Sequence, residues 1–416
     1  MNKPVINIKN LNVDYITDKN PINAVRDVTF EIFSGEIFGL VGESGSGKST
    51  VVQAMMRILP PPAIISKGEV IINNEDILAS SSLDVVGMRW KKISIVMQSA
   101  LNALNPVLSI REQIHDVLKT HKNLIGLDAD ERAKELLSLV EIDHDRLDSF
   151  PHQLSGGMKQ RIVIAIALAI MPPIIIMDEP TTALDVIVER EIIAKIIDLR
   201  KKLGFTILFI THDLNLLLEF ADRLAIMKNG EIVELDKVEN IHAGGKHPYT
   251  KKLIGSIPST SGKRQKGLLS KPKSLNLSKN PILEVRNLKK VFQSPGFFNK
   301  NKLIAVNDVS FKIHKGEIVG LVGESGSGKS TVAKLVTRLI RPSEGSIYLN
   351  GENKKVTESR NVPLQYRKDV QMVFQDPFGS LNSIHTLYHH LSRPLYRHRL
   401  KDEVTMLPYI IDLLEK

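Results

Sequence analysis

Nine residues that could bind phosphate occur twice in this 416-residue chain, at 42–50 and at 323–331. Both copies read Gly-Glu-Ser-Gly-Ser-Gly-Lys-Ser-Thr and fit the pattern G-x-x-x-x-G-K-[ST]. In this pattern backbone N–H groups form a nest for phosphate oxygens, the Lys reaches the β- and γ-phosphates, and the Ser hydroxyl binds Mg²⁺. The spacing therefore predicts binding of a nucleoside triphosphate. The predicted ligands are Gly42, Ser44, Gly45, Ser46, Gly47, Lys48, Ser49 and Thr50, and in the second copy Gly323, Ser325, Gly326, Ser327, Gly328, Lys329, Ser330 and Thr331.

The residues around the first copy predict a strand, a loop and a helix. Residues 37–41 are an apolar run suited to a buried strand, and after Lys48 apolar residues recur at helical spacing until Pro60. A helix N-terminus placed after such a loop adds its dipole to the anion site. An ordinary glycine-rich turn is the alternative, and the two copies with the same flanks argue against it.

Acidic and histidine side chains follow two other predicted strands. The apolar run 174–177 leads into Asp178-Glu179, and 206–210 leads into Thr211-His212. In parallel sheets ligands bind at the carboxyl edge, so these side chains are expected there and not in a solvated loop. Strands that alternate with helices predict an α/β fold with a mostly parallel sheet covered on both faces.

Three local signals define the ends of elements. Asn229-Gly230 predicts a two-residue hairpin turn. Gly204 is expected to close a long helix that ends at Leu203. Asp128-Ala129-Asp130-Glu131 is expected to form the N-terminal cap of a helix whose apolar face runs to Val140.

Composition excludes some classes of protein. The chain has no cysteine, which excludes disulfides, thiolate metal sites and cysteine nucleophiles and fits a reducing cytoplasm. No secretory signal is expected, because residues 1–4 lead directly into a strand-like segment. The most apolar stretch, 162–177, is shorter than the roughly 20 residues needed to span a bilayer. The net charge of +10 allows an anionic neighbour but is spread along the chain.

The second half of the chain begins as a repeat of the first. Residues 316–331 match 35–50 at every position but one, where Val319 replaces Phe38. The period of about 280 residues suits a tandem duplication of whole domains. Between the copies, Ser, Lys, Arg, Pro and Gly predict a flexible basic linker. The predicted organisation is a complete domain at 1–258, a linker at 259–280 and the N-terminal part of a second domain at 281–416.

With these motifs in order, residues 1–255 resemble the nucleotide-binding domain of an ABC transporter. Leu154-Ser155-Gly156-Gly157-Met158 resembles the family signature, and 174–179 resembles the Walker B strand. The resemblance implies P-loop NTPase domains, each with an antiparallel β subdomain and an α-helical subdomain. Thr182-Ala183-Leu184-Asp185 resembles the D-loop, Gln98 the Q-loop, His212 the switch histidine and Tyr15 the aromatic that stacks on adenine.

The resemblance also implies hydrolysis of ATP with Mg²⁺. Glu179 corresponds to the general base, His212 to a hydrogen-bond donor to the γ-phosphate and Gln98 to a further catalytic residue. The implied metal ligands are Ser49 and Gln98, with Asp178 acting through water. The resemblance also implies that nucleotide is contacted by signature and D-loop residues. The signature of one domain faces the nucleotide held by the opposite domain. These residues are Ser155, Gly156, Gly157 and Asp185.

His247-Pro248-Tyr249-Thr250 resembles the tail of ATPases that serve oligopeptide and dipeptide importers. This likeness implies integral-membrane permease subunits and a solute-binding protein as partners, and no nucleic acid. It implies a peripheral location on the cytoplasmic face of the inner or plasma membrane. The transported solute is not written in this chain.

The second half carries fewer of the family's motifs. It has Phe292 as the candidate adenine aromatic, the second loop, and Gln375 as the Q-loop residue, with Ser330 and Gln375 as implied metal ligands. We expect nucleotide binding there without hydrolysis by its own residues, and an exposed, unstable second core. The chain is interpreted as a truncated tandem ATPase, in which a working site needs a second nucleotide-binding domain from its own chain or another copy.

Two other interpretations stay open at this stage. A soluble ABC-type translation factor on ribosomes would also carry two such domains, but the short linker and the His-Pro-Tyr tail argue against it. A non-catalytic truncated remnant would hydrolyse no ATP.

Overall fold

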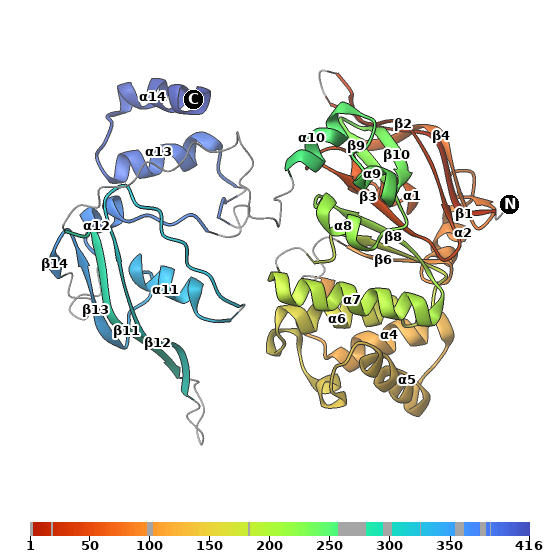
Figure 1. Ribbon diagram of the computed structural model, residues 1–416, viewed down its shortest axis with the longest axis horizontal. Helices are drawn as coiled ribbons and strands as arrows, with labels where there is room; N and C mark the ends of the chain where they lie inside the picture. Colours follow the sequence, from red (N-terminus) through yellow and green to blue (C-terminus); the bar gives the residue numbers. More distant parts are fainter. Residues whose placement is uncertain are drawn as a thin grey trace. The chain divides into compact units, whose positions relative to one another are not determined.

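The computed structural model describes residues 3–17, 20–97, 103–181, 184–256, 280–293, 302–324, 326–353, 362–374, 380–382 and 384–416. They belong to two compact units, within 1–266 and within 267–416 (Figure 1). The predicted linker lies outside the described residues except for Asn280. The predicted domain boundaries therefore stay predictions.

The first unit is built on a six-stranded sheet in the order β10-β9-β3-β8-β7-β6. Five strands run parallel, and only β10 is antiparallel to its neighbour β9. This confirms the predicted α/β fold with a mostly parallel sheet. The strands are β3 (Ile37–Gly42), β6 (Ile93–Val96), β7 (Ile174–Asp178), β8 (Thr206–Thr211), β9 (Arg223–Lys228) and β10 (Glu231–Lys237).

The strand β3 at the centre of this sheet is buried along its whole length. Its side chains alternate between two cores, as the two-residue period of a strand requires. Phe38 and Leu40 pack with the antiparallel sheet, whereas Ile37 and Val41 pack with the helices. A strand buried on both faces reads as a continuous apolar run, which is why the sequence predicted it.

An antiparallel sheet in the order β2-β1-β4-β5 covers one face of the central sheet. Its alternating pattern is visible in the burial of Val28, Phe30 and Ile32. The strands are β1 (Pro4–Tyr15), β2 (Ile22–Phe33), β4 (Ala63–Ile72) and β5 (Glu75–Asp76).

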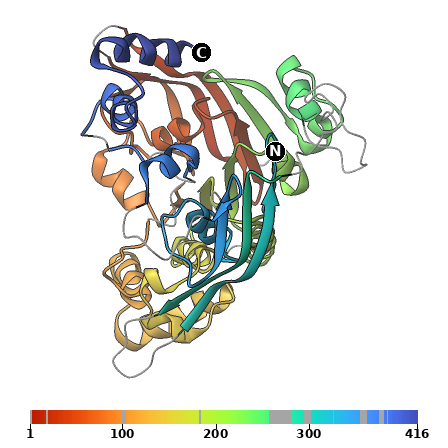
Figure 2. The same ribbon diagram turned by 90° about the vertical axis from the view of Figure 1, so that its left-hand side faces the viewer.

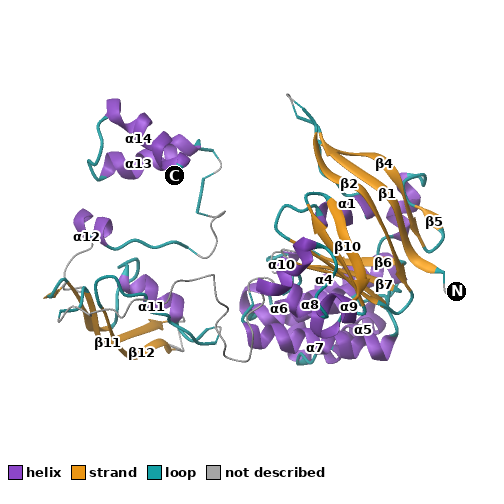
Figure 3. Cartoon of the chain, turned by 45° about the horizontal axis from the view of Figure 1, so that its top comes forward, coloured by secondary structure: helices purple, strands orange, loops and turns teal. Residues whose placement is uncertain are grey.

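Most helices of the first unit gather on one side of its strands (Figure 3). The implied α-helical subdomain is formed by α4, α5 and α6, which pack against one another. The helices are α1 (Lys48–Met55), α2 (Ser82–Met88), α4 (Ile110–Lys122), α5 (Gly126–Leu139), α6 (Gly156–Ala167), α7 (Val186–Leu203), α8 (Leu214–Phe220), α9 (Val238–His242) and α10 (Pro248–Ser256), with 3₁₀ turns η1 (His144–Asp148) and η2 (Pro151–Gln153).

Two of the three predicted element ends are confirmed and one is wrong. Gly204 ends α7 with a φ of 75°, and Asn229 and Gly230 (φ 51° and 86°) form the β9–β10 turn. The cap predicted at 128–131 is wrong, because α5 begins at Gly126, whose backbone is left-handed (φ 61°), and its N-cap is Ile125. Asp128 lies in the first turn, where its charge still favours the helix dipole.

The second unit repeats the antiparallel sheet and the helix after the loop. Its strands pair in the order β12-β11-β13-β14, and Figures 1 and 2 show β11 and β12 as long paired strands. The elements are β11 (Leu283–Gln293), β12 (Lys302–Ile313), β13 (Glu344–Leu349), β14 (Glu352–Asn353), α11 (Lys329–Val336), α12 (Leu364–Asp369), α13 (Leu387–Arg397) and α14 (Glu403–Glu415).

The expected exposure of apolar residues in the second unit is confirmed in the segment before its loop. Residues 317–322 are described but belong to no strand. Ile318 is 97% exposed and Val322 is 94% exposed. No helix among the described parts of either unit is both long and apolar enough to cross a membrane.

Candidate functional site

The first phosphate-binding loop connects the end of β3 to the start of α1, as predicted. Gly47 caps α1 with a φ of 100°, and a Cβ there would lie 2.6 Å from the carbonyl oxygen of Ala24. Only glycine fits such a backbone and such a close approach without strain. Ser44 and Gly45 lie exposed at the tip of the loop, so its N–H groups are open to a ligand.

Lys48 lies beneath this loop and is only 5% exposed. Its Nζ donates hydrogen bonds to the carbonyls of Gly42 (2.8 Å) and Glu43 (2.9 Å). Burial lowers the pKa of Lys48, and the negative charges of Glu179 and Asp178 oppose that shift. The ammonium is thus held in the loop, with two carboxylates close enough to favour its charged form.

Ser49 of the loop is hydrogen-bonded to Asp178, the last residue of β7. Its Oγ donates to Oδ1 of Asp178 at 3.2 Å, although the two residues are 129 positions apart. Burial raises the pKa of Asp178, and the Glu179 charge raises it further, while Ser49 and Lys48 lower it. A buried carboxylate in this position favours a neighbouring cation.

Glu179 and His212 meet at the carboxyl edge of the sheet. Nδ1 of His212 lies 3.2 Å from Oε1 of Glu179. The Glu179 backbone is left-handed (φ 47°), and its N–H donates to the carbonyl of Ile210 on β8 at 2.9 Å. The Glu179 side chain is 13% exposed and that of His212 is 63% exposed. A half-buried carboxylate and an accessible imidazole are therefore adjacent, beside Lys48 and Asp178.

The signature residues lie at the start of α6, in the helical part of the unit (Figure 1). Ser155 caps this helix by accepting a hydrogen bond from the N–H of Met158 at 3.3 Å. A Cβ at Gly157 would lie 2.7 Å from Val188, so α6 and α7 approach closely there. Asp185 caps α7 by accepting from the N–H of Val188 at 3.0 Å. The signature is thus positioned on a different part of the unit from the phosphate-binding loop.

Tyr15 lies at the end of β1, opposite Ile22 on β2 and Ala63 on β4. The same end of β2 carries Ala24, whose carbonyl borders Gly47. The antiparallel sheet therefore brings Tyr15 to the side of the loop. Gln98, Ser325 and Gln375, together with Thr182 and Ala183 of the D-loop segment, lie outside the described residues.

The second loop has the same local geometry as the first. Gly328 caps α11 with a φ of 95°, and Lys329 Nζ donates to the carbonyls of Gly323 (2.6 Å) and Glu324 (2.5 Å). Phe292 is 41% exposed, with Lys290 Nζ 5.1 Å from its ring centroid. Among the residues that the structure describes in this unit, no carboxylate pairs with Ser330.

The first site fits magnesium nucleotide by the chemistry of its donors. The loop offers backbone N–H groups and Lys48 to phosphate, and the buried Ser46 hydroxyl makes no hydrogen bond of its own. In the described residues no group of three His, Cys, Asp or Glu side chains could hold a metal. Mg²⁺ commonly uses only one or two protein ligands besides phosphate and water, and Ser49 with Asp178 supplies such a set.

One neighbour of the loop was not predicted as part of the site. Tyr249 borders a cavity of about 420 Å³ together with Glu43 of the loop and Lys228 at the end of β9. Its contact with the loop joins residues about 200 positions apart in the sequence. The sequence singled out His247–Thr250 as a family marker, but no local signal pointed to this contact.

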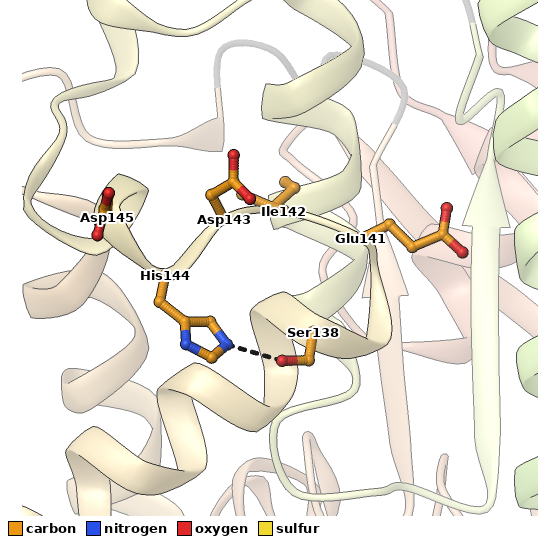
Figure 4. A pocket seen from close by; sticks show the side chains of 6 residues that line it. All are labelled: Ser138, Glu141, Ile142, Asp143, His144 and Asp145. Atoms are coloured by element: carbon orange, nitrogen blue, oxygen red, sulfur yellow. Dashed lines mark hydrogen bonds between the residues drawn. The ribbon is translucent and has the colours of Figure 1, made fainter.

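A second cavity, of about 570 Å³, is lined by residues at the end of α5 (Figure 4). There Ser138 Oγ lies 2.7 Å from Nε2 of His144, an arrangement that could suggest a nucleophile. The Ser138 hydroxyl, however, donates to the carbonyl of Lys134 at 3.0 Å. His144 must then donate to Ser138 and cannot act as its base. In Figure 4 neither Asp143 nor Asp145 lies against the imidazole, so this cavity has no catalytic arrangement.

Comparison with known proteins agrees with this geometry. The family model described as ABC transporter matches residues 25–182 and 306–407. These ranges cover more than half of the chain and include both loops. The chain therefore belongs to the ABC transporter family and is an ABC-type ATPase.

Curated relatives match nearly the whole chain. The glutathione import ATP-binding protein GsiA of Escherichia coli (strain K12) is 35% identical over 98% of this chain and 70% of its own length. GsiA of Salmonella paratyphi A is 34% identical over 100% of this chain and 71% of its own length. The comparisons do not support the ribosome-bound alternative.

Solved structures of ABC cassettes match the fold. The ATP-binding cassette MJ0796 in a dimeric post-hydrolysis state with ADP and Pi has a TM-score of 0.51 and 31% identity, covering 56% of this chain and 98% of its own. The cbiO1 structure from Clostridium perfringens has a TM-score of 0.50 and 25% identity, covering 61% of this chain and 93% of its own.

Proposed function

We propose that this chain is the ATP-hydrolysing subunit of an importer for peptides or similar small solutes. The observation that carries the proposal is the meeting of Lys48, Asp178, Glu179 and His212 at one edge of the central sheet. The import role and the solute class rest on the relatives, which are named for import of the tripeptide glutathione.

Each residue has a role in this proposal. Lys48 and the loop N–H groups neutralise the β- and γ-phosphates, and Ser49 with Gln98 binds Mg²⁺, with Asp178 acting through water. Bound Mg²⁺ would supply further neutralisation of phosphate charge. Ser46 has a free hydroxyl for a phosphate oxygen, and Tyr15 would stack on adenine. Glu179 is the general base that takes a proton from the attacking water, a role worth roughly 10²–10⁴ in rate.

His212 is proposed to donate a hydrogen bond to the γ-phosphate. The contact with Glu179 limits how it can do so, because a carboxylate only accepts and Nδ1 must carry a proton. A second donor at Nε2 then requires the imidazolium form. Alternatively, His212 exchanges Glu179 for the phosphate as its partner. In either case the half-buried Glu179 is held beside the imidazole until ligand binds.

The signature is proposed to act on nucleotide held by an opposing nucleotide-binding domain. Ser155, Gly156 and Gly157 open α6, and a helix N-terminus favours phosphate. Asp185 lies close by as the cap of α7. The second unit is proposed to bind nucleotide through Gly323–Thr331, Phe292 and Gln375. Permease subunits and a solute-binding protein are the proposed partners, at the cytoplasmic face of the inner or plasma membrane.

Uptake of labelled glutathione by cells tests this proposal. A strain that lacks its own glutathione importer ATPase should regain uptake with this chain and its permease, and should not regain it with the Lys48→Ala variant. Cell fractionation is the second arm, in which the chain should sediment with membranes. Sedimentation with ribosomes, or uptake that is unaffected by Lys48→Ala, would contradict the proposal.

A further inference from the structure

The helix α10 begins with the His-Pro-Tyr segment and is fixed firmly at its start. The carboxylate of Glu234 on β10 accepts the N–H groups of Lys246 (2.6 Å) and His247 (2.9 Å). Nδ1 of His247 accepts the N–H of Tyr249 at 3.1 Å. These acceptors satisfy N–H groups that the start of a helix leaves without partners. The start of α10 therefore cannot move without losing several hydrogen bonds.

The turn before α10 is closely packed as well. Gly245 has a left-handed backbone (φ 60°), and a Cβ there would lie 2.4 Å from Cγ2 of Thr250. Thr250 is fully buried. Only a residue without a side chain fits between the turn and the helix, so the position of α10 relative to β10 is closely defined.

Tyr249 extends from this fixed helix to the phosphate-binding loop. The residue is 6% exposed, and Lys228 Nζ lies 4.7 Å from its ring centroid. Burial raises the pKa of Tyr249, and the side chain of Glu43 raises it further. Tyr249 lines one cavity with Glu43, the second residue of the loop, and Lys228, the last residue of β9, and its buried hydroxyl has no hydrogen-bond partner among the described residues.

Strand β9 and the β9–β10 turn also contact the backbone of the phosphate-binding loop. A Cβ at Gly42 would lie only 2.3 Å from the carbonyl oxygen of Met227 on β9. The N–H of Gly230 donates to the carbonyl of Ser46 at 3.1 Å. A glycine-rich loop has many accessible backbone conformations, so these outside contacts are what select one of them.

We propose that Tyr249 is a positioning residue for the first phosphate-binding loop. Its ring packs against Lys228 at the end of β9 and lies beside Glu43 of the loop, so that the loop N–H groups are preorganised for phosphate. Preorganised donors need no rearrangement when the ligand binds, which increases affinity. α10 also packs against α8, which follows His212, so the same helix supports both sides of the site. This inference rests on the proposed function of the loop as an ATP site.

Nucleotide affinity in matched variants tests this role. All variants carry Lys329→Ala, so that the first loop dominates the signal of a fluorescent ATP analogue. Tyr249→Ala should raise the Kd and the KM for ATP about tenfold with little change in kcat, because a misplaced loop weakens the positioning of ligand. Tyr249→Phe keeps the ring and should restore both constants. Leu147→Ala removes a fully buried side chain of η1 and is the control for stability alone.

The outcomes separate positioning from stability. If Leu147→Ala raised the Kd as much as Tyr249→Ala at the same loss of Tm, Tyr249 would be merely structural. An unchanged Kd in Tyr249→Ala, or no rescue by Tyr249→Phe, would also overturn the role. Lys228→Gln removes the cation over the ring and should raise the Kd by a smaller factor, even if Tyr249→Ala does not fold. If the Kd values follow this order but the chain hydrolyses no ATP, the proposed ATPase activity is contradicted and the positioning role of Tyr249 is not.

Discussion

In the first unit the loop follows β3, whose six residues are all buried between β8 and β9. In the second unit the same nine residues follow the segment 317–322, which is described but belongs to no strand. Leu40 is fully buried, whereas its counterpart Leu321 is 53% exposed. Identical residues thus have different surroundings, because β8 and β9 flank the first segment, whereas the second pairs with no strand among the described residues.

The local geometry of the two loops is nevertheless the same. The caps Gly47 and Gly328 have φ values of 100° and 95°, and each loop lysine donates to the carbonyls five and six residues before it. The glycines of each loop therefore form the phosphate nest locally, whatever surrounds the loop. The carboxylates and histidine that would make it a hydrolytic site are brought by other strands.

The largest expected effect is on turnover. Glu179→Gln should retain ATP binding and lower the rate of hydrolysis by roughly 10²–10⁴, because the general base is lost. Phosphate release and binding of a fluorescent ATP analogue measure the two properties. Glu191→Gln, which removes a surface carboxylate paired with Arg161, is the matched control and should change neither. Unchanged turnover in Glu179→Gln would contradict the assignment of Glu179 as general base. Either the chain would be non-catalytic or hydrolysis would occur at another site.

The second prediction concerns stability at equivalent positions before the two loops. Leu40→Ala should lower the free energy of unfolding by about 2–5 kcal/mol, since it leaves a cavity in a packed core. Leu321→Ala should change it by less than about 0.5 kcal/mol, because the side chain is largely exposed. Urea unfolding followed by circular dichroism measures both. Equal losses would mean that the segment 317–322 is packed like β3.

The third prediction compares the two lysines. Lys48 is 5% exposed and feels two carboxylates, whereas Lys329 is partly exposed. Lys48→Ala should weaken binding of ATP by about 10- to 100-fold, the range for loss of hydrogen bonds to a charged group. Lys329→Ala should have a smaller effect, because solvent screens its charge. Titration with a fluorescent ATP analogue measures both, and a larger loss from Lys329→Ala would reverse the comparison.

The smallest expected effect concerns Asp178, whose carboxylate accepts a hydrogen bond from Ser49 of the first loop. Its pKa is raised above 3.8, the ordinary value, chiefly by burial. The stabilisation from the protonated form is present below pH 3.8 and is lost as pH rises through the pKa of the folded state. Without Mg²⁺, Asp178→Asn should therefore raise Tm at pH 7, and the gain should shrink as pH falls towards 4.

Thermal unfolding at several pH values measures this difference. Asp198→Asn is a suitable control, because Asp198 pairs with Lys202 on the surface and its pKa is lowered. A lower Tm for Asp178→Asn at pH 7 would mean that the ionised carboxylate stabilises the fold.

Much of the first site could be predicted because its residues end apolar strands. Asp178 ends β7, Glu179 follows it and His212 follows β8, and parallel strands bring their carboxyl ends to one edge. The start of α5 was predicted wrongly, since a left-handed glycine can begin a helix ahead of a capping residue. The contact of Tyr249 with Glu43 could not be predicted, because it depends on how β9, β10 and α10 fold back on the loop.

The sequence by itself determined the two phosphate nests, because glycine positions and helix starts act over a few residues. It also determined the α/β fold class through the apolar runs of buried strands. Only the tertiary structure decided which loop lysine is buried, since burial of Lys48 depends on strands β7, β8 and β9 from distant parts of the chain. The 3.2 Å contacts of Ser49 with Asp178 and of Glu179 with His212 have the same origin. Contacts of this kind depend on sheet order, which local residue patterns do not encode.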